Sequence, residues 1–128
     1  MAASIPTLDS KLRVLVVDDE KNIRTTLSLC LEQFGCRVSA VSVADDALSL
    51  MTQQTYDLAF VDLRLGDANG LDLIPKLMAA NAGLIVVVMT AYATIDTAVE
   101  AIRRGASDYL AKPFDPAQIR RVVEQSIK

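Results

Sequence analysis

The chain is short of cysteine, and it has no excess of basic residues. Its 128 residues include two cysteines, Cys30 and Cys36, which are too few for a disulfide framework and are expected to be buried free thiols. Free thiols favour a reducing compartment, so we expect a cytoplasmic protein. A formal net charge of −3 argues against nucleic-acid binding by this segment, because nucleic-acid-binding surfaces are usually basic.

The sequence also lacks a clear signal peptide or membrane span. Residues 1–10 have neither a basic start nor an apolar core, so we expect a flexible N-terminal tail there. Residues 77–95 carry no charge and have about the length of a spanning helix. However, Asn81-Ala82-Gly83 interrupts this stretch, and the β-branched residues 85–88 are typical of a strand. We therefore expect no contact with a membrane.

Strand-like and helix-like segments alternate along residues 11–128. Strands are expected near residues 12–17, 37–41, 58–61, 84–89 and 107–111, and helices near 21–34, 44–51, 71–78, 95–102 and 115–127. Ser42 and Asp115 are candidate N-caps, and Gly35 and Gly105 are candidate helix stops. Residues 63–70 are expected to form a loop, with Pro75 near the start of the following helix. This order predicts one α/β domain with a mostly parallel sheet covered by helices on both faces.

Four of the expected strands end on a polar side chain. The first is followed by Asp18-Asp19, the third by Asp62, the fourth by Thr90 and the fifth by Lys112. Taken singly, each has an ordinary interpretation, such as a helix cap, a turn or a solvated lysine. The carboxyl ends of parallel strands share one edge of a sheet, however, and α/β sheets bind ligands at that edge. Their joint occurrence predicts a pocket with three carboxylates, a hydroxyl and an ammonium group.

Such a pocket suits phosphoryl transfer. Clustered carboxylates repel one another and need a cation or bound protons, and their hard oxygen atoms suit Mg²⁺. A carboxylate can attack phosphorus to give an acyl phosphate. The Thr90 hydroxyl and the Lys112 ammonium would then hold the phosphoryl oxygens. The pattern therefore predicts a phosphoryl-acceptor site.

In their order and spacing, these residues resemble the receiver domain of bacterial two-component response regulators over residues 11–128. The resemblance implies a flavodoxin-like, CheY-like fold with a five-stranded parallel sheet of order 2-1-3-4-5. It implies that a sensor histidine kinase phosphorylates Asp62. It also implies that Asp19, Asp62 and the backbone carbonyl of Arg64 hold Mg²⁺, with Asp18 acting through water or by tuning the site.

The resemblance further implies how the phosphoryl group is held and how it is read. The backbone of Ala91 would join Thr90 and Lys112 around the phosphoryl oxygens, and a cis Lys112-Pro113 peptide is implied. Thr90 would move towards the phosphoryl group while Tyr109 turns inward, which would reshape the face of the fourth helix, fifth strand and fifth helix. That change would control an output, expected to be transcription through a downstream effector domain, with homodimerisation on phosphorylation.

Four arginines are candidates for that interface: Arg103, Arg104, Arg120 and Arg121. Their other interpretation is as ordinary solvated residues near helix ends, where basic groups also suit the helix dipole. The run at residues 90–99 is most similar to receivers of the nitrogen-regulator class. The chain departs from the family at Gly66, where a proline is usual, and Arg64 and Tyr92 fill two variable positions beside the site.

Two other functional classes remain as alternatives, besides a stand-alone or degenerate receiver used for docking. An aspartyl-phosphate phosphatase would carry its acids as Asp-x-Asp and need a cap segment, whereas Asp18 and Asp19 are adjacent. A flavin carrier would need a hydroxyl- or glycine-rich phosphate loop where this acidic pair stands. We therefore expect no enzyme activity beyond self-catalysed phosphotransfer and autodephosphorylation.

Overall fold

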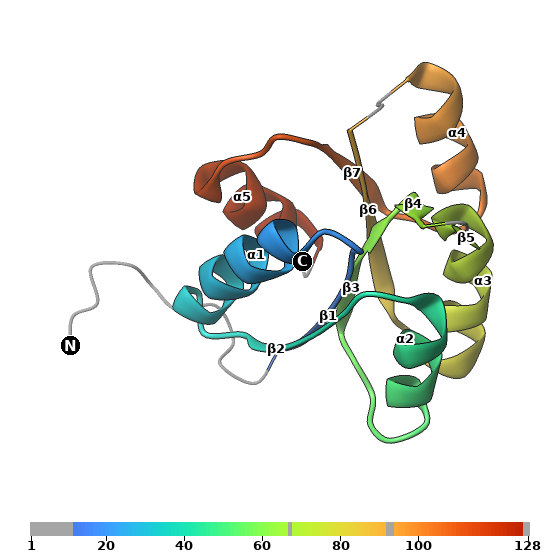
Figure 1. The fold of residues 1–128 in the computed structure, drawn as a ribbon, viewed down its shortest axis with the longest axis horizontal. Coiled ribbons are helices and arrows are strands. Elements are labelled where there is room, and N and C mark those ends of the chain that lie inside the picture. Colours follow the sequence, from blue (N-terminus) through green and yellow to red (C-terminus); the bar gives the residue numbers. More distant parts are fainter. Residues whose placement is uncertain (1–11, 67, 92–93, 127–128) are drawn as a thin grey trace.

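A computed structural model describes residues 12–66, 68–91 and 94–126. Its main sheet has five parallel strands in the order β2-β1-β3-β6-β7 (Figure 1). The strands are β1 (Arg13–Val17), β2 (Arg37–Val41), β3 (Leu58–Asp62), β6 (Ile85–Thr90) and β7 (Asp108–Ala111). Because β6 and β7 are the fourth and fifth strands of this sheet, the predicted order 2-1-3-4-5 is confirmed.

Within the described residues, five helices cover the two faces of the sheet (Figure 1). They are α1 (Lys21–Gln33), α2 (Ala44–Met51), α3 (Gly70–Ala80), α4 (Ile95–Arg103) and α5 (Pro116–Ser126). Helices α1 and α5 lie on one face, and α2, α3 and α4 lie on the other. Each face has its own apolar core, since alternate residues of a strand point to opposite sides: Leu15 and Val17 join one cluster, Val14 and Val16 the other. All five residues of β3 are buried, as expected for a central parallel strand.

Most of the expected helix ends agree with the structure. Asp115 caps α5, with its carboxylate accepting from Gln118 N and its own N–H donating to the Gln118 side chain. Gly35 and Gly105 follow α1 and α4 with positive φ angles of 95° and 117°. Cys30 and Cys36 are buried, and neither forms a disulfide among the described residues. None of the helices in the described ranges is long and apolar enough to cross a membrane.

Three details of the sequence prediction were wrong. The N-cap of α2 is Val43 and not Ser42, and it makes no side-chain cap; the acidic side chains in the first turn of α2 suit the helix dipole instead. Pro75 lies inside α3, which continues past it because Leu73, Ile74 and Leu77 of α3 are buried. Residues 63–70 contain a small antiparallel pair, β4 (Arg64–Leu65) and β5 (Ala68–Asn69). The expected N-terminal tail, residues 1–10, lies outside the described residues.

Candidate functional site

The carboxyl ends of the strands surround a pocket of about 220 Å³. Its lining combines acidic, basic, hydroxyl and backbone groups: Asp19, Glu20, Asp62, Arg64, Gly66, Thr90, Ala91 and Lys112. The polar residues that follow four separate strands in the sequence therefore do meet at one edge of the sheet. Asp18 lies close by, fully buried, and contacts the same lysine. The Lys112-Pro113 peptide is cis, as the family resemblance implied.

Lys112 joins three of the acidic groups. Its Nζ lies 2.8 Å from Asp18 Oδ2 and 3.0 Å from both Asp62 Oδ2 and Glu20 Oε1. The lysine side chain is 8% exposed, so these contacts are largely removed from water. Burial lowers the pKa of Lys112, but its close contacts with the three carboxylates outweigh burial and raise the pKa above its ordinary value. Lys112 is therefore fully protonated near neutral pH.

The surroundings of Asp18 favour the protonated form of its carboxyl group. Burial of its carboxyl group raises its pKa to about 6, against the lowering effects of Lys112 and of the Glu20 N–H, which donates to Oδ1 at 2.8 Å. The nearby charge of Asp62 raises the pKa further. The contact of Asp18 Oδ2 with Lys112 is an ion pair without hydrogen-bond geometry, so this buried oxygen has no hydrogen-bond donor among the described residues. Its positively charged neighbour is the Lys112 ammonium group, 2.8 Å away.

Asp62 ends β3 with both carboxylate oxygens engaged. Oδ1 accepts a hydrogen bond from Arg64 N at 3.0 Å, and Oδ2 accepts one from Lys112 at 3.0 Å. The chain behind it turns tightly into α3, where a Cβ atom at Gly70 would collide with the Asp62 carbonyl oxygen. This close approach requires glycine at the start of α3. Asp62 is consequently held at the end of β3 and lines the pocket with a side chain that is 6% exposed.

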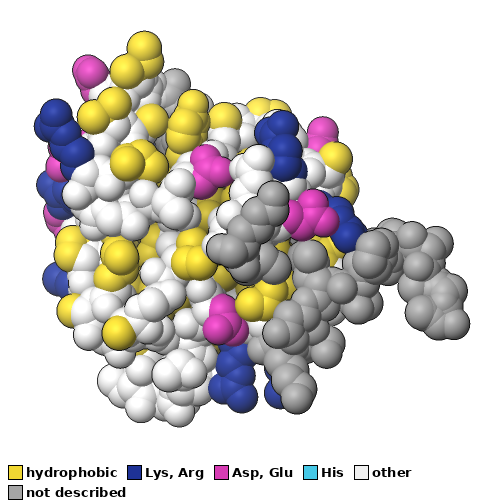
Figure 2. All heavy atoms as spheres, turned by 180° about the vertical axis from the view of Figure 1, so that it is seen from behind, with side chains coloured by type: hydrophobic (Ala, Val, Ile, Leu, Met, Phe, Trp, Pro, Cys, Tyr) yellow, Lys and Arg dark blue, Asp and Glu magenta, His cyan; other side chains and the backbone are white. Residues whose placement is uncertain are grey.

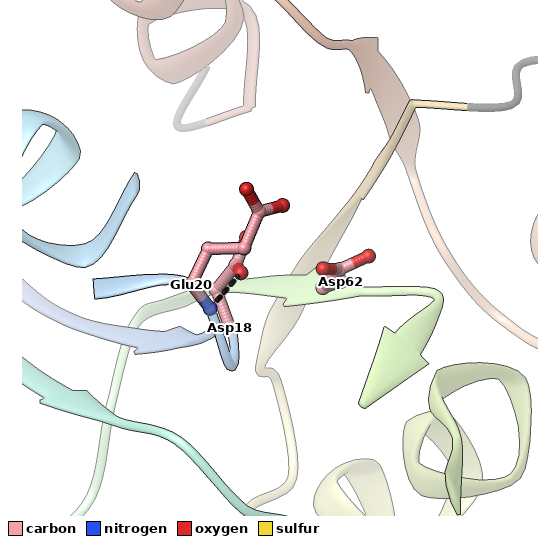
Figure 3. Close-up of side chains that lie close together, drawn as sticks. All are labelled: Asp18, Glu20 and Asp62. Atoms are coloured by element: carbon pink, nitrogen blue, oxygen red, sulfur yellow. Dashed lines mark hydrogen bonds between the residues drawn. The ribbon is translucent and has the colours of Figure 1, made fainter. Parts of the chain in front are cut away.

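The three consecutive acidic residues that follow β1, Asp18 to Glu20, have different surroundings. Figure 3 shows Glu20 beside Asp18 at the end of β1, with Asp62 on the adjacent strand. One carboxylate oxygen from each of these three residues lies within 4.8 Å of the others, an arrangement that could hold a metal ion. The side chain of Asp19 instead accepts a hydrogen bond from Gly66 N at 3.0 Å. Sequence reasoning missed Glu20, although its place directly after two aspartates was a usable signal.

Thr90 and Tyr109 lie on the two adjoining strands β6 and β7. Thr90 is 4% exposed at the end of β6 and borders the pocket, as does Ala91. Tyr109 pairs in register with Val88 of β6, but its side chain is 43% exposed. A second hollow, of about 380 Å³, lies beside this tyrosine and is lined by residues of α4. The ring of Tyr109 is therefore turned outward in this structure.

The four arginines suggested for an interface have different surroundings. Arg104 contacts Asp72 of α3 and Glu100 of α4, each at 2.8 Å, so it bridges these two helices. Arg120 pairs with Glu124 at 3.0 Å and lies over the ring of Phe34, 5.2 Å from its centroid. Arg103 borders the hollow beside Tyr109, and Arg121 is exposed on α5.

Comparison with known proteins agrees with this geometry. The model of the family described as "Response regulator receiver domain" matches residues 14–124. The chain belongs to this family. The receiver domain is 42% identical over 120 residues to the alginate biosynthesis transcriptional regulatory protein AlgB of Pseudomonas putida, and 32% identical over 117 residues to the transcriptional regulatory protein ZraR of Salmonella typhimurium. These matches cover 94% and 91% of this chain but only 27% and 26% of the two relatives. The chain therefore spans about a quarter of the length of these relatives.

Solved structures of response regulators have the same fold. A response regulator from Burkholderia pseudomallei, solved with a phosphorylated aspartic acid, a calcium ion and citrate, superposes with a TM-score of 0.82 at 34% identity. That match covers 92% of this receiver domain and 67% of the other chain. NtrX from Brucella abortus has a TM-score of 0.85 at 34% identity, with 90% and 27% coverage. The similarity to AlgB, ZraR and NtrX agrees with the predicted resemblance to the nitrogen-regulator class.

Proposed function

We propose that this receiver domain is a phosphorylation switch that accepts a phosphoryl group on Asp62 from a sensor histidine kinase in the cytoplasm. The observation that carries the proposal is the position of the Asp62 carboxylate. It borders the pocket 3.0 Å from the Lys112 ammonium, and Thr90 lines the same pocket. The similar chain from Burkholderia pseudomallei, which contains a phosphorylated aspartic acid, supports this assignment.

The chemistry follows from the groups around Asp62. A carboxylate oxygen of Asp62 attacks the phosphorus of a phosphohistidine; a P–O bond forms, the P–N bond breaks, and the electron pair leaves with the imidazole nitrogen. Lys112, already protonated and aimed at Asp62, stabilises the negative charge on the phosphoryl oxygens. The Thr90 hydroxyl and the Ala91 N–H complete the set of donors. The domain's own catalysis is limited to this transfer and to hydrolysis of the product.

The donor set fits a divalent cation, and we propose Mg²⁺. Carboxylate oxygens are the hard ligands that Mg²⁺ prefers, and one oxygen each of Asp18, Glu20 and Asp62 lies within 4.8 Å of the others. Asp19, Asp62 and the Arg64 carbonyl would hold the ion, with Asp18 acting through water. Glu20 is a further candidate because its carboxylate lies in the same cluster. When bound, the ion would offset the repulsion between the attacking carboxylate and the phosphoryl oxygens.

The output surface is proposed to be the face formed by α4, β7 and α5. Four apolar residues of this face are between 43% and 81% exposed: Ile95, Val99, Ile102 and Tyr109. Figure 2 shows apolar side chains over the top left of the molecule, where α4 lies. Phosphorylation adds negative charge and strong acceptors, so Thr90 would move towards them and let Tyr109 turn inward. The new surface would favour homodimerisation and control a downstream effector domain in transcription.

The proposal is tested by intact-mass spectrometry after incubation with acetyl phosphate and Mg²⁺. Wild-type protein should gain one phosphoryl group, and Asp62→Asn should gain none. Asp45→Asn, an exposed aspartate on α2, is the matched control and should be phosphorylated normally. Folded wild-type protein that gains no mass in the presence of Mg²⁺, or Asp62→Asn protein that still does, would refute the assignment.

A further inference from the structure

The small hairpin of β4 and β5 contacts both acidic strand ends through its backbone. Arg64 N donates to Asp62 Oδ1 at 3.0 Å, and Gly66 N donates to Asp19 Oδ2 at 3.0 Å, across 47 residues of sequence. One short segment therefore supplies a hydrogen-bond donor to a carboxylate at the end of β3 and to another that follows β1. Hydrogen bonds from N–H groups to ionised carboxylates are stronger than those between neutral groups.

The second of these donors depends on the conformation of Gly66. Its φ angle is +61°, in the left-handed region that favours glycine. No atom lies within 4 Å of an ideal Cβ at this position, so the constraint comes from the backbone and not from crowding. A proline, the usual residue here in the family, would fix φ near −65° and would have no N–H to donate. The contact with Asp19 is therefore one that a proline could not make.

The hairpin that presents this N–H is anchored at its base. Arg64 pairs with Asn69 and Leu65 with Ala68, and the side chain of Leu65 is buried in the core. Gly70 N then donates to the Leu63 carbonyl at 2.9 Å. The position of the Gly66 N–H is thus set by the sheet and by α3, so it can orient the exposed side chain of Asp19.

We propose that Gly66 is a positioning residue for divalent-cation binding, acting through the carboxylate of Asp19. Its N–H holds Oδ2 and fixes the side chain, while Oδ1, which accepts no hydrogen bond from the described residues, is left for the ion. Carboxylate ligands are commonly held by such second hydrogen bonds, and losing one typically costs 10- to 100-fold in metal affinity. The inference deepens the proposed function and rests on it for the identity of the ion.

The test compares Mg²⁺ affinity, measured by calorimetry, in variants at two glycines. Gly66→Pro removes the N–H and should weaken Mg²⁺ binding by about tenfold or more. Gly66→Asn keeps the N–H and tolerates the left-handed conformation, so it should bind Mg²⁺ nearly as the wild type does. Gly83→Pro is the matched control: Gly83 has a φ angle of +87° and equally open surroundings, but it precedes β6 at the opposite edge of the sheet. It should lose stability without losing affinity.

The NMR signal of the Gly66 amide proton provides a second test, which does not depend on whether Gly66→Pro disturbs the rest of the hairpin. The amide proton of Gly66 should resonate downfield in metal-free wild type, because its acceptor is charged, and Asp19→Ala should move it upfield. Unchanged Mg²⁺ affinity in Gly66→Pro, an equal loss in Gly83→Pro, or an amide signal indifferent to Asp19→Ala would each overturn the inference. Wild-type protein that binds Mg²⁺ but accepts no phosphoryl group would instead refute the proposed function and leave this inference standing.

Discussion

Two regions of the receiver domain depart from the usual distribution of polar and apolar groups, in opposite directions. At the ends of β1 and β3, charged side chains are buried, with Asp18 fully removed from solvent and Lys112 nearly so. Around α4 and β7, apolar side chains are exposed, with Ile95 at 81% and Val99 at 44%. The first region carries an electrostatic cost that a bound cation can relieve, and the second an apolar surface that a partner can cover.

The two regions are also neighbours through the sheet. Thr90 borders the charged pocket at the end of β6, and β6 pairs directly with β7, which carries Tyr109. Helix α4, which follows β6, has a single fully buried residue, Ala101. A helix with so little buried surface is held weakly and can shift at low cost. We propose that the charge added to the pocket by phosphorylation is transmitted through Thr90 to this loosely packed surface.

Removing the positive charge of Lys112 should have the largest effect on the stability of the domain. Lys112→Ala leaves the buried acids without their shared partner, and breaking such buried pairs typically costs about 3–5 kcal/mol. We expect a loss of that size at pH 7.5 in urea unfolding with a chelator present. Part of it should return at pH 5, where Asp18 takes up a proton. A loss below about 1 kcal/mol would show that the charged region is not strained.

Neutralising the buried acid should act in the opposite direction. The pKa of Asp18 is about 6 in the folded domain and 3.8 in the reference state, so its favourable contribution is complete below pH about 4 and is lost as the pH rises through about 6. Asp18→Asn should therefore stabilise the metal-free domain by about 1–3 kcal/mol at pH 7.5. Paired urea titrations should show this advantage widening from pH 4 to pH 7. A difference in unfolding free energy that does not change with pH, or an Asp18→Asn variant less stable than the wild type, would contradict the raised pKa of Asp18.

A change on the apolar region should leave stability almost untouched. Val99→Ser should alter the free energy of unfolding by no more than about 0.5 kcal/mol, as is usual for surface positions. The phosphorylated variant should nevertheless fail to dimerise in light scattering, whereas phosphorylated wild type should double in mass. Leu29→Ser, on α1 at 57% exposure, is the control and should dimerise normally. Dimers of phosphorylated Val99→Ser would place the partner surface elsewhere.

The smallest effect is expected at the ion pairs that join α3 and α4. Arg104 bridges Asp72 and Glu100 at the surface, where ion pairs contribute little and are screened by salt. Arg104→Ala should therefore change thermal stability only slightly, and the change should vanish at high salt. A large loss that persists at high salt would show that these ion pairs restrain α4.

The residue pattern was sufficient to predict a parallel sheet and the residues that meet at its edge, whereas the strand order came from the resemblance to the receiver family. Apolar periodicity marks the strands, and parallel pairing then forces Asp18, Asp62, Thr90 and Lys112 together. The sequence could not show which acid contacts which donor, because that depends on backbone positions far apart in the chain. The bond from Gly66 N to Asp19 and the contact of Glu20 with Lys112 are of this kind. The β4–β5 pair was missed because two-residue strands carry no periodicity.

The coupling of the two regions is tested most directly by the NMR signals of the Tyr109 ring, assigned with Tyr109→Phe. On phosphorylation by acetyl phosphate and Mg²⁺, these signals should shift in wild type, while those of Tyr56, buried at the opposite edge, should not. In Thr90→Ala, Asp62 should still be phosphorylated, but the Tyr109 signals should stay at their starting positions. Phosphorylated wild type with unmoved Tyr109 signals, or Thr90→Ala with the full shift, would contradict the account.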